Sequence, residues 1–204
     1  MATLAVSRPV LLRRARALEV FTVVWNSLEG IIAVGLGVRA GSVALVGFGM
    51  DSVIETSSGA ILLWRLQARR DAEDAEAAER RALRLVGASL LLLALYVAGD
   101  ALLSILRRDA PEESVAGIVL AVISLIAMPL LARSKRRLAT QLDSEALRAD
   151  SVQTIICAYL SAILLAGLAL NAQFGWWWAD PLAALAMVPI ITREGLEAWR
   201  GDHD

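Results

Sequence analysis

The sequence predicts an all-α polytopic membrane protein with six transmembrane helices, arranged as two inverted three-helix repeats, and with both termini in the cytoplasm. The first observation is composition, because 57% of the 204 residues are hydrophobic and the mean hydropathy is +0.60. Such values are too apolar for a soluble domain of this length. The second is that charged residues gather between long apolar runs, and the third is a similarity between two of these runs. We expect residues 1–204 to form a single transmembrane domain.

Six apolar segments are long enough to cross a bilayer as helices, which takes about 20 residues each. They are residues 18–38, 43–65, 84–106, 114–133, 148–170 and 178–193. The first 20 residues lack an apolar core followed by a cleavage site, so we expect no cleaved signal peptide. Three tryptophans at 176–178 are typical of an interfacial belt where the short last span begins. The charged connection at 69–84 contains neither Gly nor Pro and predicts helical extensions of the second and third spans.

Basic residues indicate the orientation. Arginines precede the first span and flank the connection at 69–84, and a basic cluster follows the fourth span: Arg133, Lys135, Arg136 and Arg137. The other connections carry fewer basic residues, apart from Arg107 and Arg108. The positive-inside rule then predicts that both termini are cytoplasmic. We expect an integral protein of a bacterial cytoplasmic (inner) membrane.

The internal similarity links residues 42–63 with 144–165 at a constant offset. SVAL at the start of the first segment aligns with SEAL in the second, and an AILL near the end of the first aligns with an AILL near the end of the second. Asp51 then falls on Gln153, and Glu55 on Cys157. Because the second and fifth spans run in opposite directions, this duplication is an inverted repeat, an arrangement that secondary transporters use to place a site near the midplane.

Two acids interrupt the second span. Asp51 and Glu55 are four residues apart, so they lie on one face of a helix. Each carboxylate costs several kcal/mol in hydrocarbon unless it is neutralised, paired or liganded. In the fifth span Gln153 and Cys157 also share one face. Together the two helices offer two carboxylates, an amide oxygen and a thiolate, and we predict a metal site formed by Asp51, Glu55, Gln153 and Cys157.

Each of these residues also has a structural interpretation. The two acids are alternatively a helix-helix hydrogen-bonding pair or partners of arginine. Gln153 is equally an interhelical hydrogen-bonding residue, and Cys157 a small buried hydrophobic residue. Asp150, one turn before Gln153, is expected either to pair with Arg148 or to guard the entrance as a gate.

Other embedded polar residues are assigned to the surroundings of the site. Asn26 and Glu29 in the first span are expected either to orient the ligands by hydrogen bonds or to make a helix-packing contact. Asp100 in the third span is either a salt-bridge partner or part of a proton path. Asp180, followed by Pro181, is expected to cap its own helix. Six glycines are expected to let the first two spans pack closely: Gly30, Gly35, Gly37, Gly47, Gly49 and Gly59.

Three stretches resemble the transmembrane domain of the cation diffusion facilitator (cation efflux) family. AGSVALVGFGMDSVIE resembles its second span, EALRADSVQTIICAYLS its fifth, and WWADPLAALAMVPIITREGLEAW its sixth. The resemblance implies export of a divalent metal in exchange for protons. It also implies a pair of ligands on each of the second and fifth spans. Residue by residue, these pairs fall on Asp51 and Glu55, and on Gln153 and Cys157.

The sequence departs from the family pattern. The spans contain no histidine, Phe48 stands where an acid often precedes the first pair, and Gln153 and Cys157 replace the usual His and Asp. The chain also ends soon after the sixth span, so we expect a variant that lacks the family's C-terminal cytoplasmic domain. The sequence also resembles short eukaryotic transmembrane zinc-efflux proteins of the same fold, which likewise favour acids in the second span. Oxygen ligands favour manganese, whereas a thiolate favours zinc, cadmium or iron.

These observations predict a secondary transporter that exports a divalent cation, with protons competing for the emptied carboxylates. The metal is then the transported substrate, and no cofactor is expected. The alternative is a non-transporting carrier that regulates or assembles with another membrane protein. An intramembrane enzyme is disfavoured because no Ser/His pair and no HExxH motif is present. Expected partners are the cation, protons, the lipid bilayer and a second copy of the chain, and the sequence offers no basic patch for nucleic acid.

Overall fold

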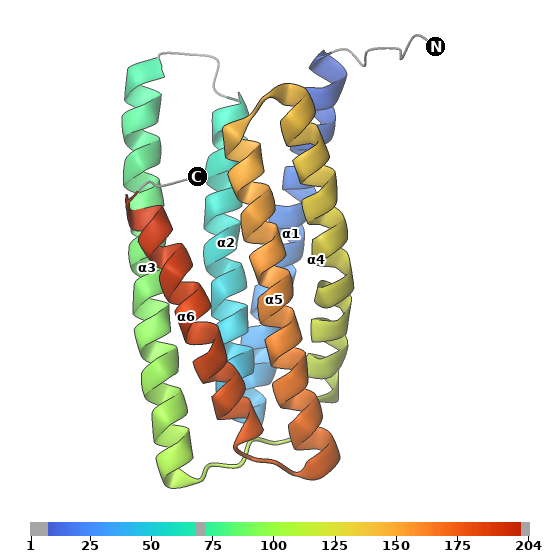
Figure 1. Cartoon of the computed structure of the whole chain (residues 1–204), viewed down its shortest axis with the longest axis vertical. Coiled ribbons are helices and arrows are strands. Elements are labelled where there is room, and N and C mark those ends of the chain that lie inside the picture. The colour runs from blue at the N-terminus through green and yellow to red at the C-terminus, as the bar shows by residue number, and fades with distance from the viewer. Residues whose placement is uncertain (1–7, 68–71, 201–204) are drawn as a thin grey trace.

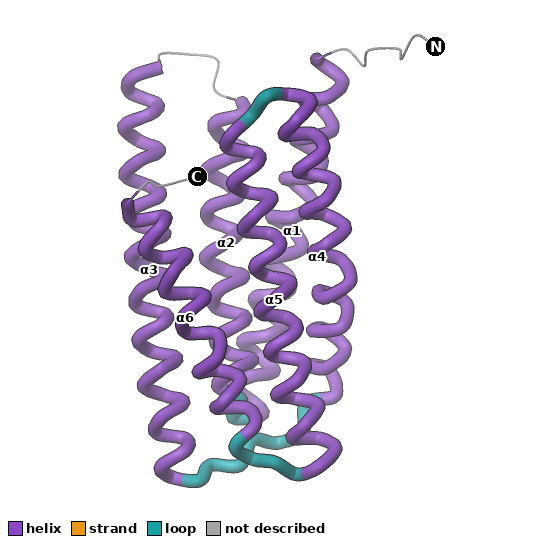
Figure 2. Tube along the Cα trace, viewed as in Figure 1, coloured by secondary structure: helices purple, strands orange, loops and turns teal. Residues whose placement is uncertain are grey.

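Each predicted span lies within one helix, except that the fourth and sixth spans were predicted to begin one residue before their helices do. The computed structural model describes residues 8–67 and 72–200, and these form six helices joined by short connections (Figures 1 and 2). The helices are α1 (Arg8–Ala40), α2 (Val43–Gln67), α3 (Ala72–Arg107), α4 (Val115–Leu142), α5 (Glu145–Phe174) and α6 (Ala179–Arg200). Most extend beyond the predicted spans, and the expected helical extension before the third span is present from Ala72. Residues 68–71 of that connection lie outside the described residues.

Within the described ranges, four helices are long and apolar enough to cross a membrane: α1, α3, α4 and α5. Many of their large apolar side chains point outward, including Ile31, Leu95 and Leu106, each at least 70% exposed. Outward-facing apolar side chains on long helices are suited to lipid contact. The chain is therefore an all-α polytopic membrane protein.

The helices alternate in direction, so that α1 and α4, α2 and α5, and α3 and α6 run opposite to each other (Figure 1). The most extensive packing joins α1 to α2, α4 to α5, and α3 to α6. A rotation that exchanges the first three helices with the last three preserves this pattern. The arrangement is the one that an inverted three-plus-three repeat requires.

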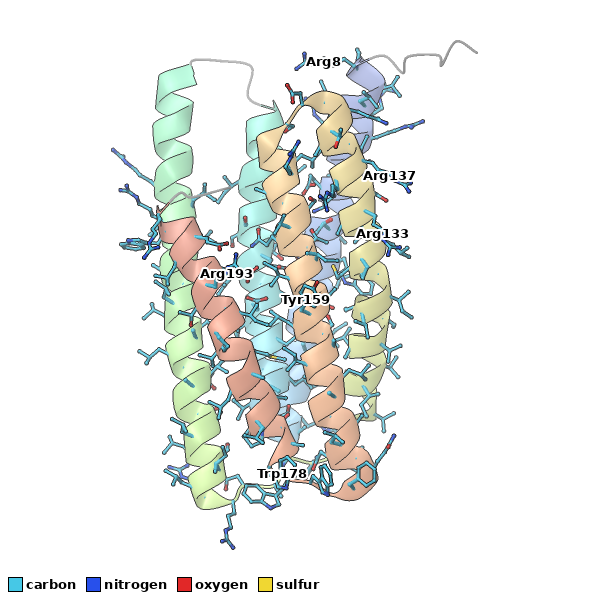
Figure 3. The ribbon with its side chains drawn as sticks, in the orientation of Figure 1. Arg8, Arg133, Arg137, Tyr159, Trp178 and Arg193 are labelled. Carbon is cyan, nitrogen blue, oxygen red and sulfur yellow. The ribbon has the colours of Figure 1, made fainter. Side chains whose placement is uncertain are left out.

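Charged and aromatic side chains mark opposite ends of the bundle. Arg8, Arg133 and Arg137 lie toward the end where the described chain begins, whereas Trp178 lies at the other end (Figure 3). At that second end Trp176 stacks on Trp178 with ring centroids 4.9 Å apart, directly before α6. Aromatic residues at one boundary and arginines beyond the other are typical of a membrane-spanning bundle.

Glycines bring α1 and α2 into close contact. A Cβ atom on Gly30 would lie 2.9 Å from the carbonyl oxygen of Gly49, and one on Gly37 would lie 2.7 Å from the backbone nitrogen of Val46. Gly49 and Gly59 are equally close to side chains of α1. The expectation is wrong for two of the six glycines. Gly47 instead faces Val97 of α3, and Gly35 meets no other described atom within 4 Å.

Asp180 holds the start of α2 rather than the start of its own helix. It lies in the first turn of α6, and its carboxylate accepts hydrogen bonds from Ser42 Oγ at 2.5 Å and from the backbone nitrogen of Val43 at 2.9 Å. A carboxylate beside the first N–H groups of a helix stabilises that helix end. The expected role as a cap of α6 is therefore wrong, because the start of α2 lies closer to this side chain.

We predict opposite effects for two alanine substitutions on α1. Gly37→Ala forces a Cβ atom against the backbone of α2 and should lower the free energy of unfolding by about 1–3 kcal/mol. Gly35→Ala enters open space and should be neutral or stabilising by up to about 1 kcal/mol, since alanine favours helix more than glycine. Thermal unfolding of both purified variants checks this difference, and equal stability of the two would contradict the close α1–α2 contact.

Candidate functional site

Asp51 and Glu55 lie on the buried face of α2 and are only partly satisfied by hydrogen bonds. Asp51 is fully buried and Glu55 is 6% exposed. Neither carboxylate oxygen of Asp51 has a hydrogen-bond partner in the described part of the chain, nor does Oε1 of Glu55. Buried carboxylate oxygens are normally hydrogen-bonded or paired with a positive charge. Three unpartnered oxygens within one helical turn therefore require an explanation.

Two residues of α1 contact the same face of α2. The side-chain amide of Asn26 donates a hydrogen bond of 2.9 Å to Oε2 of Glu55. Glu29, which is 1% exposed, accepts a hydrogen bond of 3.2 Å from Ser52 of α2 and a second one from Ser124 of α4. Asn26 thus fixes one oxygen of Glu55 and leaves the other available, while Glu29 links α1, α2 and α4.

The two predicted ligands on α5 lie in different surroundings. Gln153 is half-buried, and its side-chain oxygen accepts a hydrogen bond of 3.2 Å from Ser58 of α2. It shares a small pocket with Asn26 and Glu55. Cys157 is fully buried within the main apolar core, at electrostatic range from Glu55. The structure therefore brings Gln153 and Cys157 toward the acids of α2 from the opposite half of the repeat.

The sequence analysis missed a further acid, Glu194 on α6. It is 7% exposed, and neither of its carboxylate oxygens has a hydrogen-bond partner among the described residues. It lies within electrostatic range of Asp51 and Glu55. The predicted sixth span ended at residue 193, so Glu194 was placed outside the membrane. A helix-period count along α6, which is buried at Ala184, Met187 and Ile191, would have placed it on the inner face.

These side chains occupy one layer of the bundle. Helices α2 and α6 begin at the same end, and α5 ends there (Figure 1). At a rise of about 1.5 Å per residue, Glu55 lies about 18 Å and Glu194 about 23 Å from the starts of their helices, and Cys157 lies about 26 Å from the end of α5. By the same measure Asp51 lies about 12 Å along α2, so Asp51, Glu55 and Glu194, which we refer to as the acidic layer, span about two helical turns near mid-bundle.

A second acidic group is paired with a lysine of the chain itself. Lys135 of α4 is fully buried, and its ammonium group lies 2.5 Å from Asp150 of α5 and 3.3 Å from Glu19 of α1. We refer to Glu19, Lys135 and Asp150 as the ion triad. Lys135, which the sequence analysis counted in the basic cluster after the fourth span, is buried because a buried acid of α1 and a partly buried acid of α5 surround it. Asp150, for which pairing with Arg148 was one expectation, pairs with Lys135.

The ion triad lies beside the same pocket as the acids of α2. Asp150 lines this pocket together with Glu55 and Gln153, and Thr22 and Thr154 complete its polar surface. Asp150 is about 8 Å from the start of α5 at 1.5 Å per residue, on the side of Glu55 that faces the arginine-bearing end. The pocket therefore connects the level of Glu55 with the level of the ion triad.

Asp100 lies apart from these groups. It is half-buried on α3, about 10 Å from the outer end of that helix, and accepts a hydrogen bond of 3.2 Å from Tyr96 on the same helix. Its role as a gate, a salt-bridge partner or a proton carrier stays a prediction.

The acids do not form a finished metal site. In residues 8–67 and 72–200, no three His, Cys, Asp or Glu side chains converge closely enough to hold an ion. The carboxylates of Asp51 and Glu194 have no hydrogen-bond partner among the described residues. Their side chains can therefore rotate without breaking a hydrogen bond. The arrangement supplies oxygen donors in one buried layer, which suits a hard divalent cation.

We predict that Lys135 is required for stability. Lys135→Met removes the positive charge between two buried acids and should lower the free energy of unfolding by about 3–5 kcal/mol. The matched control is Arg136→Met, which changes the neighbouring exposed cation and should shift stability by less than about 0.5 kcal/mol. Unfolding of both purified variants by heat or denaturant tests this. Similar stability of the two would contradict a structural role for the ion triad.

Comparison with known proteins gives a family match over most of the chain. Residues 20–200 match the protein family described as the cation efflux transmembrane domain. An uncharacterized transporter of Synechocystis is 28% identical over 169 residues, which cover 80% of this chain and 53% of that protein. The cation-efflux pump FieF of Shewanella oneidensis is 28% identical over 113 residues, which cover 55% of this chain and 36% of that protein. The match thus spans about half of the first relative and about a third of the second.

Proposed function

Because the chain belongs to the cation efflux family, as its sequence resemblance predicted, we propose that it is a secondary transporter that exports a divalent cation across a bacterial cytoplasmic membrane. The ion binds at Asp51 and Glu55 of α2, and Gln153 and Cys157 approach it from α5. The single observation that carries this proposal is the buried pair of acids with three unpartnered carboxylate oxygens. A divalent cation neutralises both charges at once.

The polar pocket supports access from the cytoplasmic end. Its lining runs from Asp150 to Glu55 by way of Gln153 and Thr154, and the positive-inside rule assigns the arginine-bearing end to the cytoplasm. Lys135 occupies the cytoplasmic limit of this route while it is held by Asp150. Release of Asp150 from Lys135 would open the route, which makes Asp150 a gate in this proposal.

The repeat geometry supplies a way to move the ion. Asp51 and Glu55 belong to the first half of the chain, and Gln153 and Cys157 to the second. Rocking of one half against the other changes which end of the bundle reaches a site between them. After release of the ion outside, protons bind the emptied carboxylates and allow the carrier to return.

We predict that removal of either charge abolishes transport. Asp51→Asn and Glu55→Gln should each reduce uptake of zinc, manganese, iron or cadmium into proteoliposomes by at least about tenfold, because a neutral amide binds a cation far more weakly than a carboxylate. The matched controls are Asp109→Asn and Glu113→Gln, which make the same changes at exposed positions. Full flux in both site variants would refute the proposed site. No flux of any of these ions through the folded wild-type protein would favour the non-transporting carrier.

We predict that metal flux depends on a proton gradient. In proteoliposomes, an acidic interior should accelerate metal uptake, because protons leaving down their gradient exchange for metal entering. An alkaline interior should slow uptake. Initial rates measured at both gradients, with the membrane potential clamped, check the sign. Equal rates would show transport without proton exchange.

A further inference from the structure

Glu194 is an unpaired acid on the inner face of α6. It is 7% exposed, and both of its carboxylate oxygens lack a hydrogen-bond partner in the described residues. The adjacent Arg193 does not neutralise it, because that side chain is 81% exposed and pairs with Glu197 at 2.7 Å. Figure 3 shows Arg193 on α6 at mid-height of the bundle. A carboxylate in this position is costly unless a cation reaches it.

Close packing of α6 on α3 fixes the direction in which Glu194 points. A Cβ atom on Gly195 would lie 3.1 Å from the carbonyl oxygen of Gly87, and one on Gly87 would lie 2.6 Å from the backbone nitrogen of Trp199. Backbones this close allow little rotation of α6 about its axis. The orientation of Glu194 toward the interior is therefore built into the α3–α6 contact.

Glu194 faces the acids of α2. Helix α6 packs on α2 as well as on α3, and Glu194 lies within electrostatic range of both Asp51 and Glu55. Glu194 and Glu55 are at nearly the same height, about 23 Å and about 18 Å along helices that start at the same end. Asp51 lies one turn before Glu55, about 12 Å along α2. Five of the six oxygens of these three carboxylates lack a partner among the described residues.

We propose that Glu194 supplies a third carboxylate to the divalent cation held by Asp51 and Glu55, so that the ion is bound between α2 and α6. This inference rests on the proposed function and extends its site. A glutamate side chain has three rotatable bonds, so rotation about them brings its unpartnered oxygens toward the ion without movement of the helix. Asn26 and Gln153 supply neutral oxygen donors at the edge of the site.

This assignment accounts for the weak donors on α5. Gln153 and Cys157 carry no carboxylate, so a site confined to α2 and α5 has only two carboxylates. With Glu194, the second half of the chain contributes an acid after all, from α6 instead of α5. A set of three carboxylates and amide oxygens favours a hard cation such as manganese over a thiolate-preferring ion.

The test is equilibrium binding of manganese and of zinc to the full chain purified in detergent. Glu194→Gln should weaken binding by at least about tenfold and should abolish the rise in melting temperature that the metal produces. Glu113→Gln is the matched control, because it makes the same change at an exposed residue, and it should bind as the wild type does. Glu194→Asp, which keeps the charge, should retain part of the affinity.

The metal-free proteins separate ligation from a structural role. Without metal, Glu194→Gln should melt no lower than the wild type, because it removes an uncompensated buried charge. A lower melting temperature would overturn the inference, and so would wild-type affinity in Glu194→Gln. Failure of the wild type to bind either metal would overturn both this inference and the proposed function. If Glu194→Gln weakens metal binding but the wild type shows no flux, the proposed transport would be overturned and the assignment of Glu194 as a ligand would stand.

Discussion

The structure depends on how it accommodates carboxylates within an apolar bundle. A buried acid requires a positive charge, a set of hydrogen bonds or a ligand, and the chain uses each of these at a different place. Hydrogen bonds satisfy Glu29, which accepts from Ser52 and Ser124. The same is true of Asp180, which accepts from Ser42 and the start of α2. These contacts join helices from both halves of the chain and so hold the bundle around its acidic layer.

The contrast between the two remaining acidic groups separates structure from function. In the ion triad, the ammonium group of Lys135 pairs with one oxygen each of Glu19 and Asp150, so the chain itself provides a cation there, and of the triad's carboxylate oxygens Oε1 of Glu19 has no partner among the described residues. In the layer of Asp51, Glu55 and Glu194, five carboxylate oxygens have no partner in the described part of the chain. The first group contains a cation of its own. The second contains none in the described part of the chain, which is why we assign transport to it.

The sequence was sufficient for the helices and for the acids of α2, because long apolar runs and two charges within one of them need no tertiary information. Lys135 was misjudged because its neighbours in sequence, Arg136 and Arg137, are exposed, and only the approach of α1 and α5 buries it. Asp180 was assigned to its own helix because the start of α2 is distant in sequence. Glu194 was missed because hydropathy ended the sixth span one residue early. The errors for Lys135 and Asp180 concern contacts between segments far apart in the chain, whereas Glu194 required only a helix-period count along α6.

The central claim is that the acidic layer exists to bind a divalent cation through oxygen. X-ray absorption at the zinc edge, on dialysed protein loaded with one equivalent of zinc, tests it most directly. The account predicts that zinc is retained with oxygen ligands at about 2.0–2.2 Å, and any sulfur at about 2.3 Å identifies Cys157 as an additional ligand. Folded wild-type protein that retains no zinc, or that holds it only through water, would contradict the account.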